Sequence, residues 1–160
     1  MRNIDYDRKK ALAYAEKWAL KRNHRYLDFE NIGGDCTNFA SQCIYAGCGV
    51  MNYTPTFGWY YNSPNDRAAA WTGVGFLYNF LTNNKGVGPY AIEIALNYAQ
   101  IGDIVQLGDS DGRFYHTLVI VSVRNGNIYV ASHTFDAYMR PLSSYLFDNI
   151  RLLHIVGARV

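Results

Sequence analysis

Cys36 is the residue whose type and position most clearly suggest chemistry. It lies in the segment NIGGDCTNFASQCIYAGCG, residues 31–49, at the start of a helix that we expect over residues 36–47. Unpaired N–H groups and the positive end of the helix dipole favour an anion at this position, which would lower the pKa of the thiol from about 8.5. Gly33 and Gly34 leave room for a substrate carbonyl. The alternative is that Cys36 is only a small residue at a helix start.

The other two cysteines are weaker candidates. Cys43 shares the apolar face of the expected helix with Phe39 and Ala40, so we predict that it is buried and inert. Cys48 follows the helix and gains nothing from its N-terminal dipole. The sequence contains no Cys-x-x-Cys pair, so we expect no metal site and no cofactor. The odd number of cysteines favours reduced thiols over a disulfide framework.

A thiol nucleophile needs a base, and His116 is the best placed of the four histidines. It begins the expected strand HTLVIVSV, where its ring could lie at the end of a sheet beside a helix N-terminus. A structural role is the alternative. We predict structural roles for His24, in a polar connection, and for His154, in an apolar strand. The preceding GDSDG is interpreted as a hairpin turn, because a calcium loop would need further ligands.

His133 is the first candidate for a third catalytic residue. It ends the strand NIYVASHT, and the Asn-Gly turn before that strand predicts a hairpin that brings His133 close to His116. A hydrogen bond from His133 could then orient the ring of His116. Asp136 is the alternative, since a carboxylate is the commoner orienting group, although it would lie in the following loop.

Aromatic residues gather in the segment VMNYTPTFGWYYNSPNDR, residues 50–67, which has no helical or strand periodicity and is predicted to be a long ordered loop. Trp59 and Tyr60 are candidates for the wall of a substrate groove, whereas Trp71 is predicted to belong to the core. The sequence does not separate the two roles, so the assignment is a preference.

These residues must be positioned by helices and strands of one domain covering residues 1–160. Apolar spacing predicts helices over residues 5–22, with Asp5 as N-cap, over 36–47 and over 69–81. After Gly102 the segments are β-branched and aromatic, which predicts four antiparallel strands. They are DIVQL, FYHTLVIVSV, NIYVASHT and IRLLHIVGARV. Helices followed by strands predict an α+β fold, with N-terminal helices packed on a C-terminal antiparallel sheet.

Composition excludes several classes of function. Hydrophobic residues make up 49% of the 160 and charged residues 18%, which is typical of a folded domain. The net charge of +2 is scattered, so we expect no nucleic-acid partner. No apolar run is long enough to span a membrane. The N-terminus lacks the pattern of a secretory signal, which favours the cytoplasm; a secreted or cell-envelope protein is the alternative if a signal segment has been removed.

The segments GGDCTNFASQCIYAGC, FYHTLVIV and SHTFDAYMRPL resemble the bacterial putative amidase domain family. That family is grouped with the papain-like cysteine peptidases, near the NlpC-type cell-wall endopeptidases. The resemblance covers nearly the whole chain. Its most specific feature is the order of Asp-Cys-Thr at a helix start, a Gly-Asp-Ile strand and a histidine that opens a strand.

The resemblance implies a papain-like fold and a thiol hydrolase of amide bonds that works through a thioester. Cys36 would be the nucleophile, His116 the base and His133 the third polar residue. The substrate would be a peptide or another amide, with peptidoglycan as one candidate, although the insert VMNYTPTFGWYY departs from the cell-wall relatives. The alternatives are an acyltransferase on the same fold and a catalytically silent module that binds a peptide or glycan.

Overall fold

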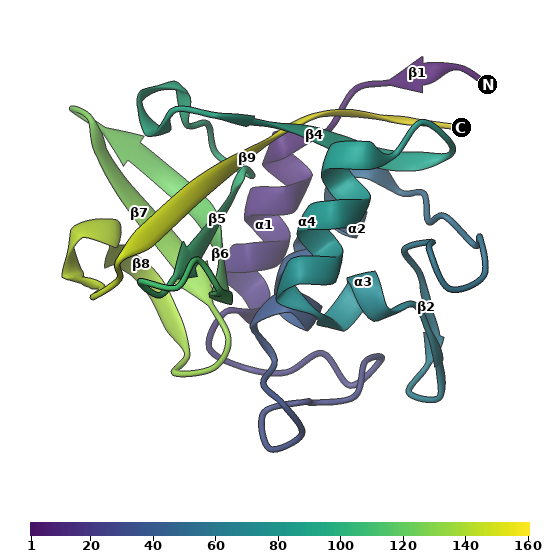
Figure 1. The fold of residues 1–160 in the computed structure, drawn as a ribbon, viewed down its shortest axis with the longest axis horizontal. Helices are drawn as coiled ribbons and strands as arrows, with labels where there is room; N and C mark the ends of the chain where they lie inside the picture. The colour runs from purple at the N-terminus through teal and green to yellow at the C-terminus, as the bar shows by residue number, and fades with distance from the viewer.

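We describe the protein from a computed structural model that covers residues 1–160. It contains four α-helices and two short 3-10 helices: α1 Arg8–Trp18, α2 Cys36–Cys48, α3 Ala69–Thr72, α4 Val74–Asn83, η1 Leu96–Tyr98 and η2 Leu142–Ser144. Nine strands complete the fold: β1 Asn3–Ile4, β2 Tyr61–Ser63, β3 Asp66–Arg67, β4 Gly88–Ile94, β5 Ile104–Gly108, β6 Phe114–Arg124, β7 Asn127–Ser132, β8 Ala137–Pro141 and β9 Asn149–Arg159. The α+β class predicted from the sequence is confirmed (Figure 1).

The first helix is shorter than its apolar spacing predicts. Its N-cap is Asp7, not Asp5, because the Asp7 carboxylate accepts a hydrogen bond from the Lys10 backbone N–H at 3.1 Å. Ala11 and Ala15, one turn apart, are fully buried and let α1 pack closely on the rest of the protein. The helix ends at Trp18, which leaves Arg22 in the connection that follows.

The second helix lies at the centre of the molecule. Every residue of α2 except Tyr45 and Ala46 is buried, so the helix is held on nearly all sides. It runs one residue beyond the expected end, to Cys48, and is capped by Gly49, whose φ of 69° is the left-handed conformation that glycine adopts easily. Cys36 therefore begins an element that cannot shift without disturbing the core.

The helix expected over residues 69–81 is divided into two. Gly73, between α3 and α4, has an extended backbone with ψ of 130°, which ends α3 after one turn and starts α4 in a new direction. Glycine is a poor helix former, so the break falls at the residue where it costs least. The helical periodicity of the sequence continued across this break.

One antiparallel sheet carries the second half of the chain. Its strand order is β1-β9-β5-β6-β7-β8, and β4 pairs with β9 as well. The four predicted strands correspond to β5, β6, β7 and β9, whereas β1, β4 and β8 were not predicted. In this sheet His116 of β6 pairs with Leu107 of β5, close to the end of both strands.

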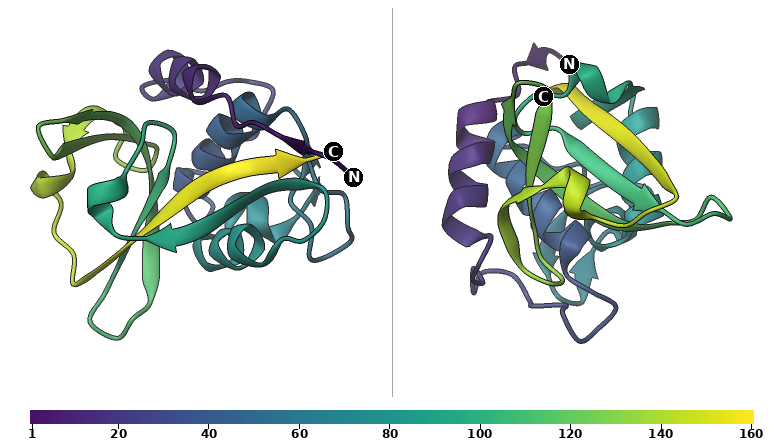
Figure 2. Two further views of the ribbon diagram at one scale, coloured as in Figure 1. Left: turned by 90° about the horizontal axis from the view of Figure 1, so that it is seen from above. Right: turned by 90° about the vertical axis from the view of Figure 1, so that its left-hand side faces the viewer.

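Alternate residues of the sheet serve two hydrophobic cores. Val119 and Val121 face the larger core, which contains the buried residues of α1, α2 and α4, while Leu118 and Ile120 face a smaller core on the other side. The helices lie on one face of the sheet, as two further views show (Figure 2). None of the helices is both long and apolar enough to cross a membrane.

The two ends of the chain lie side by side (Figure 2). Arg2 and Val160 exchange two backbone hydrogen bonds, each of 2.9 Å, and β1 pairs with the last residues of β9.

Candidate active site at the start of helix α2

Cys36 is the first residue of α2, and the chain before it is shaped to bring it there. Gly33 and Gly34 have φ values of 91° and 101°, which residues with a side chain rarely adopt. At Gly34 an added Cβ would also lie 3.3 Å from the Thr134 hydroxyl. Asp35 is the N-cap residue, but its carboxylate does not bond to the N–H groups of the helix. Those N–H groups therefore remain available at the start of α2.

The thiol of Cys36 is more deeply buried than the sequence suggested. Burial raises its pKa, a backbone hydrogen bond at Thr117 and the Thr37 hydroxyl lower it in part, and the negative charge of Asp35 raises it further. The Thr37 hydroxyl lies 3.8 Å from the sulfur. The sequence predicts a thiolate at this position, whereas the raised pKa favours the protonated thiol.

His116 lies in β6, the strand that contacts the start of α2. Its Nε2 is 3.3 Å from the Ser132 hydroxyl, and its ring centre is 6.1 Å from that of Tyr145. Burial lowers the pKa of His116 to about 4, and the positive charge of Arg140 acts in the same direction. The imidazole is therefore neutral at pH 7 and able to accept a proton.

A side-chain bridge joins the segments that carry Cys36 and His116. Thr37 follows Cys36 in the sequence, and Thr117 follows His116. The hydroxyl groups of the two threonines lie 2.9 Å apart in the protein interior. No hydrogen bond joins the thiol and the imidazole directly, and Nδ1 of His116 makes no hydrogen bond within the chain.

Behind the Thr117 hydroxyl lies a buried carboxamide that sequence analysis did not single out. Gln106 is fully buried, and its Nε2 donates to the Thr117 hydroxyl at 3.3 Å and to the Val74 carbonyl at 3.0 Å. Its Oε1 accepts two hydrogen bonds from Arg151, at 2.9 and 2.6 Å. This chain of polar groups fixes the direction of the Thr37–Thr117 bridge.

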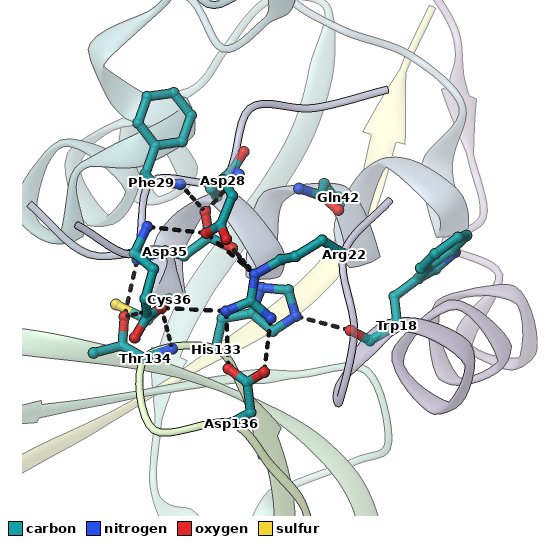
Figure 3. Close-up of polar contacts among 12 residues, drawn as sticks. Trp18, Arg22, Asp28, Phe29, Asp35, Cys36, Gln42, His133, Thr134 and Asp136 are labelled. Atoms are coloured by element: carbon teal, nitrogen blue, oxygen red, sulfur yellow. Dashed lines mark hydrogen bonds and ion pairs between the residues drawn. The ribbon is translucent and has the colours of Figure 1, made fainter. Parts of the chain in front are cut away.

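His133 does not contact His116. Its Nδ1 bonds with the Asp35 carboxylate, its Nε2 donates to the Trp18 carbonyl at 2.8 Å, and its ring stacks on Phe39 with centres 4.2 Å apart (Figure 3). Both ring nitrogens of His133 therefore have hydrogen-bond partners, and neither partner is His116. The hydrogen bond to His116 that the hairpin suggested is made by Ser132 instead.

The register of the hairpin explains this correction. Val119 pairs with Ala131, so the next residues outward, Leu118 and Ser132, lie opposite each other and point to the same face as His116. Neighbouring residues of a strand point to opposite faces, so His133 points towards the helices. A shift of one residue in the assumed register exchanges the roles of Ser132 and His133.

Asp136, the alternative third residue, is also engaged elsewhere. Its carboxylate oxygens bond to Arg22 at 2.7 and 3.0 Å (Figure 3). Arg22 lies at the centre of four carboxylates, since Asp28, Glu30 and Asp35 are within 3.2, 3.3 and 3.6 Å of its guanidinium group. We call these five residues together with His133 the Arg22 cluster.

The Arg22 cluster holds together the segments around the start of α2. Asp35 is almost fully buried, and its second oxygen accepts from the Phe29 N–H at 2.8 Å and from Asn38 at 2.9 Å. The Asp35 N–H donates to the Thr134 hydroxyl at 2.9 Å. The end of α1, the loop before Cys36 and the turn after β7 are thus tied to one another. Sequence analysis missed this role, although Asp35 directly precedes the cysteine.

The aromatic residues assigned from the sequence to a groove or to the core lie in different surroundings. Trp59 is fully buried and donates its indole N–H to the Ser41 hydroxyl at 3.0 Å, so its assignment to a groove was wrong. Trp71 is fully buried, as predicted, and its ring centre lies 4.6 Å from that of Trp59. Tyr60 is half-buried beside Tyr53 and remains only a candidate.

The remaining titratable candidates lie in other surroundings. His24 is exposed, and His154 bonds at 3.0 Å to the buried Asp103, which also pairs with Arg8 at 2.7 Å. Cys43 is fully buried within the larger core, as predicted. No group of three or more His, Cys, Asp or Glu side chains is arranged to hold a metal ion.

Fold and site define an α+β protein in which a helix presents a cysteine at its N-terminus to an antiparallel sheet that carries a neutral histidine. The chain belongs to the putative amidase domain family, whose family model matches residues 5–156. The resemblance of the sequence to this family is confirmed.

Two proteins of Bacillus subtilis (strain 168) are similar to this chain. It is 35% identical over 144 residues to the uncharacterized protein YhbB, an alignment that covers 87% of this chain and 45% of YhbB. It is 28% identical over 132 residues to the uncharacterized protein YjcM, covering 78% of this chain and 30% of YjcM. The chain thus spans less than half the length of either relative. No solved structure matches it.

Proposed function

We propose that this protein hydrolyses an amide bond with Cys36 as nucleophile and His116 as base, in a papain-like arrangement. The family supports an amidase-type activity, and the thiol class is our own step beyond it. The observation that supports the proposal is the Thr37–Thr117 bridge of 2.9 Å, since it holds the start of α2 against β6 beside His116. His116 and Thr117 point to opposite faces of β6, so the proposal requires the His116 ring to reach the thiol around the end of the strand.

The pKa shifts favour a neutral thiol and a neutral imidazole over a thiolate–imidazolium pair. At neutral pH the thiol holds its proton and His116 is free to take it, because burial raises the pKa of Cys36 and lowers that of His116 to about 4. The thiol proton passes to His116 as the sulfur attacks the carbonyl carbon. Ser132, 3.3 Å from Nε2, is the group best placed to orient the ring.

The intermediate needs donors for its oxyanion. The N–H groups at the start of α2 suit this role, because the Asp35 side chain leaves them uncapped. When the intermediate collapses, the C–N bond breaks and His116 gives its proton to the leaving amine. A water molecule then attacks the thioester, His116 takes the water proton, and the carboxylic acid leaves as the proton returns to the sulfur.

The proposed substrate is a peptide or another amide. Cell-wall peptides are one candidate class and follow only from the resemblance to cell-wall endopeptidases.

The proposal is tested by hydrolysis of a panel of peptides and simple amides, including peptidoglycan stem peptides. Cys36→Ala and His116→Ala should each abolish turnover, while Cys48→Ser, a change of a thiol outside the site, should retain it. Trapping of an acylated Cys36 by mass spectrometry would establish the thioester. Turnover that survives Cys36→Ala would refute the mechanism, and binding of a peptide without turnover in any variant would favour a silent module.

A further inference from the structure

A second concave region lies away from Cys36. It is a cavity of about 770 Å³ between the loop 52–58, helix α4 and the turn that follows α4. This volume is within the range of roughly 300–1,000 Å³ found for small-molecule sites. The loop follows the C-terminal end of α2, and a helix of 13 residues is about 20 Å long, so Cys36 lies at the far end of that helix.

Aromatic rings form two walls of this cavity. Phe57 of the loop is 82% exposed and Phe76 of α4 is 61% exposed, and both line the cavity. Phe80, one turn after Phe76, is buried and forms the floor. Exposed apolar side chains that gather at a cavity mark a binding surface more often than isolated ones do.

Polar groups with unused hydrogen-bonding capacity lie between these rings. The Asn79 side chain makes no hydrogen bond. The Asn83 amide N–H groups donate to the Asn79 backbone carbonyl at 2.8 Å and to the Thr82 hydroxyl at 3.4 Å, while the Asn83 side-chain oxygen has no partner. Lys85 forms no ion pair, and no acidic residue lines the cavity. Because Phe76, Asn79 and Asn83 lie on one face of α4, an occupant would meet a ring and two carboxamides together.

The walls offer little to an extended peptide. The loop pairs its own ends, since Asn52 and Trp59 exchange backbone hydrogen bonds of 2.9 and 2.8 Å, and the Gly58 N–H donates to the Thr54 carbonyl at 2.9 Å. The opposite wall is a helix, whose main chain is paired internally. Without a free strand edge, the usual backbone pairing of a bound peptide is not possible.

The loop is built to one shape. A Cβ at Gly58 would lie 2.3 Å from the Asn52 carbonyl oxygen, so only glycine fits there. Thr56 has a φ of 66°, a strained conformation for a β-branched residue. Such strain is retained mainly at binding and catalytic sites, and here it sets the position of Phe57.

We propose that this cavity binds an uncharged saccharide. A pyranose ring has apolar C–H faces that pack on aromatic rings, and its hydroxyl groups can bond with the carboxamides and accept from the Lys85 ammonium group. The proposal rests on the cavity alone and does not require the thiol chemistry.

The test uses the Cys36→Ala protein, so that turnover cannot interfere. Chitotriose, cellotriose and trialanine are titrated by calorimetry, and the side-chain amides of Asn79 and Asn83 are followed by NMR. At least one trisaccharide should bind with a Kd of about 1 mM or tighter and shift both amides. Phe57→Ala and Phe76→Ala should each weaken binding about tenfold.

The controls separate binding from folding. Tyr98→Ala removes another exposed ring, 64% accessible and outside the cavity, and should leave the Kd unchanged. The melting temperature of each variant shows that the fold persists. The proposal is overturned if neither trisaccharide binds, if trialanine binds at the same amides, or if binding is indifferent to both phenylalanine substitutions. None of these outcomes bears on the Cys36 mechanism.

Discussion

Replacing His133 by alanine tests the importance of the Arg22 cluster most directly. The variant leaves the Asp35 carboxylate, which is 1% exposed, without its imidazole partner and removes the ring that stacks on Phe39. Breaking a buried charged pair from one side costs about 3–5 kcal/mol. Asp35 keeps the hydrogen bonds from Phe29 and Asn38 and the more distant Arg22 at 3.6 Å, so we expect the lower end, about 3 kcal/mol.

For a protein of this size that loss corresponds to a fall of about 6–12 °C in melting temperature. Thermal and urea unfolding followed by circular dichroism would measure it. His154→Ala is a matched control, since it also removes a histidine from a buried aspartate. Asp103, however, keeps its ion pair with Arg8 at 2.7 Å, and the His154 side chain is partly exposed. We expect the control to cost about 1 kcal/mol or less.

A His133→Ala variant as stable as the His154→Ala control would refute this reasoning. A second variant, Asp35→Asn, shows whether the loss of stability in His133→Ala comes from its contact with Asp35. If the two residues stabilise the fold through each other, the double variant should lose less stability than the two single variants added together.

Three further predictions concern the thiol, the histidine and the glycine before them. Iodoacetamide should label Cys36 slowly at pH 7, and the rate should keep rising up to and beyond pH 9, because burial raises the pKa of this thiol. Cys48 should react only at higher pH, since burial raises its pKa to about 11. A labelling rate of Cys36 that reaches its plateau near pH 6 would show an ion pair instead. Since the pKa of His116 is about 4 when folded and about 6.5 when unfolded, the unfolded state binds the proton first, and stability should fall by about 3 kcal/mol as the pH drops from 6.5 to 4. His116→Gln should flatten that part of the stability curve, and an unchanged slope would contradict the assignment. Gly34→Ala should cost about 1–2 kcal/mol in urea unfolding, because φ is 101° and the new Cβ would press on the Thr134 hydroxyl, and a neutral effect would count against that contact.

The general form of the fold could be predicted from local patterns, but several elements could not. Apolar periodicity located α1, α2 and the strands β5, β6, β7 and β9. It continued through Gly73, where only the packed structure shows a break. The strand β4 has the sequence GPYAIEI, in which a proline and a glutamate obscure the alternation, and its pairing with β9 joins residues about sixty positions apart.

The candidate site shows the same limit. Cys36 and His116 could be singled out by residue type and by their places at the ends of elements. The choice between Ser132 and His133 depends on the hairpin register, which shifts between Ile120 and Ser122 and cannot be counted from the turn alone. Arg22 and Asp136 are 114 residues apart, and no local pattern links them.

The paired ends of the chain have a practical consequence. Because Arg2 and Val160 already bond to each other, a short linker could close the backbone into a ring, and new ends could be opened in the exposed turn at Asn125 and Gly126. Such a permuted chain would place β7, β8 and β9 before the helices, while α2 with Cys36 would still precede β6 with His116. Comparing its refolding rate with that of the parent would show whether the helices must form before the sheet can close on Cys36.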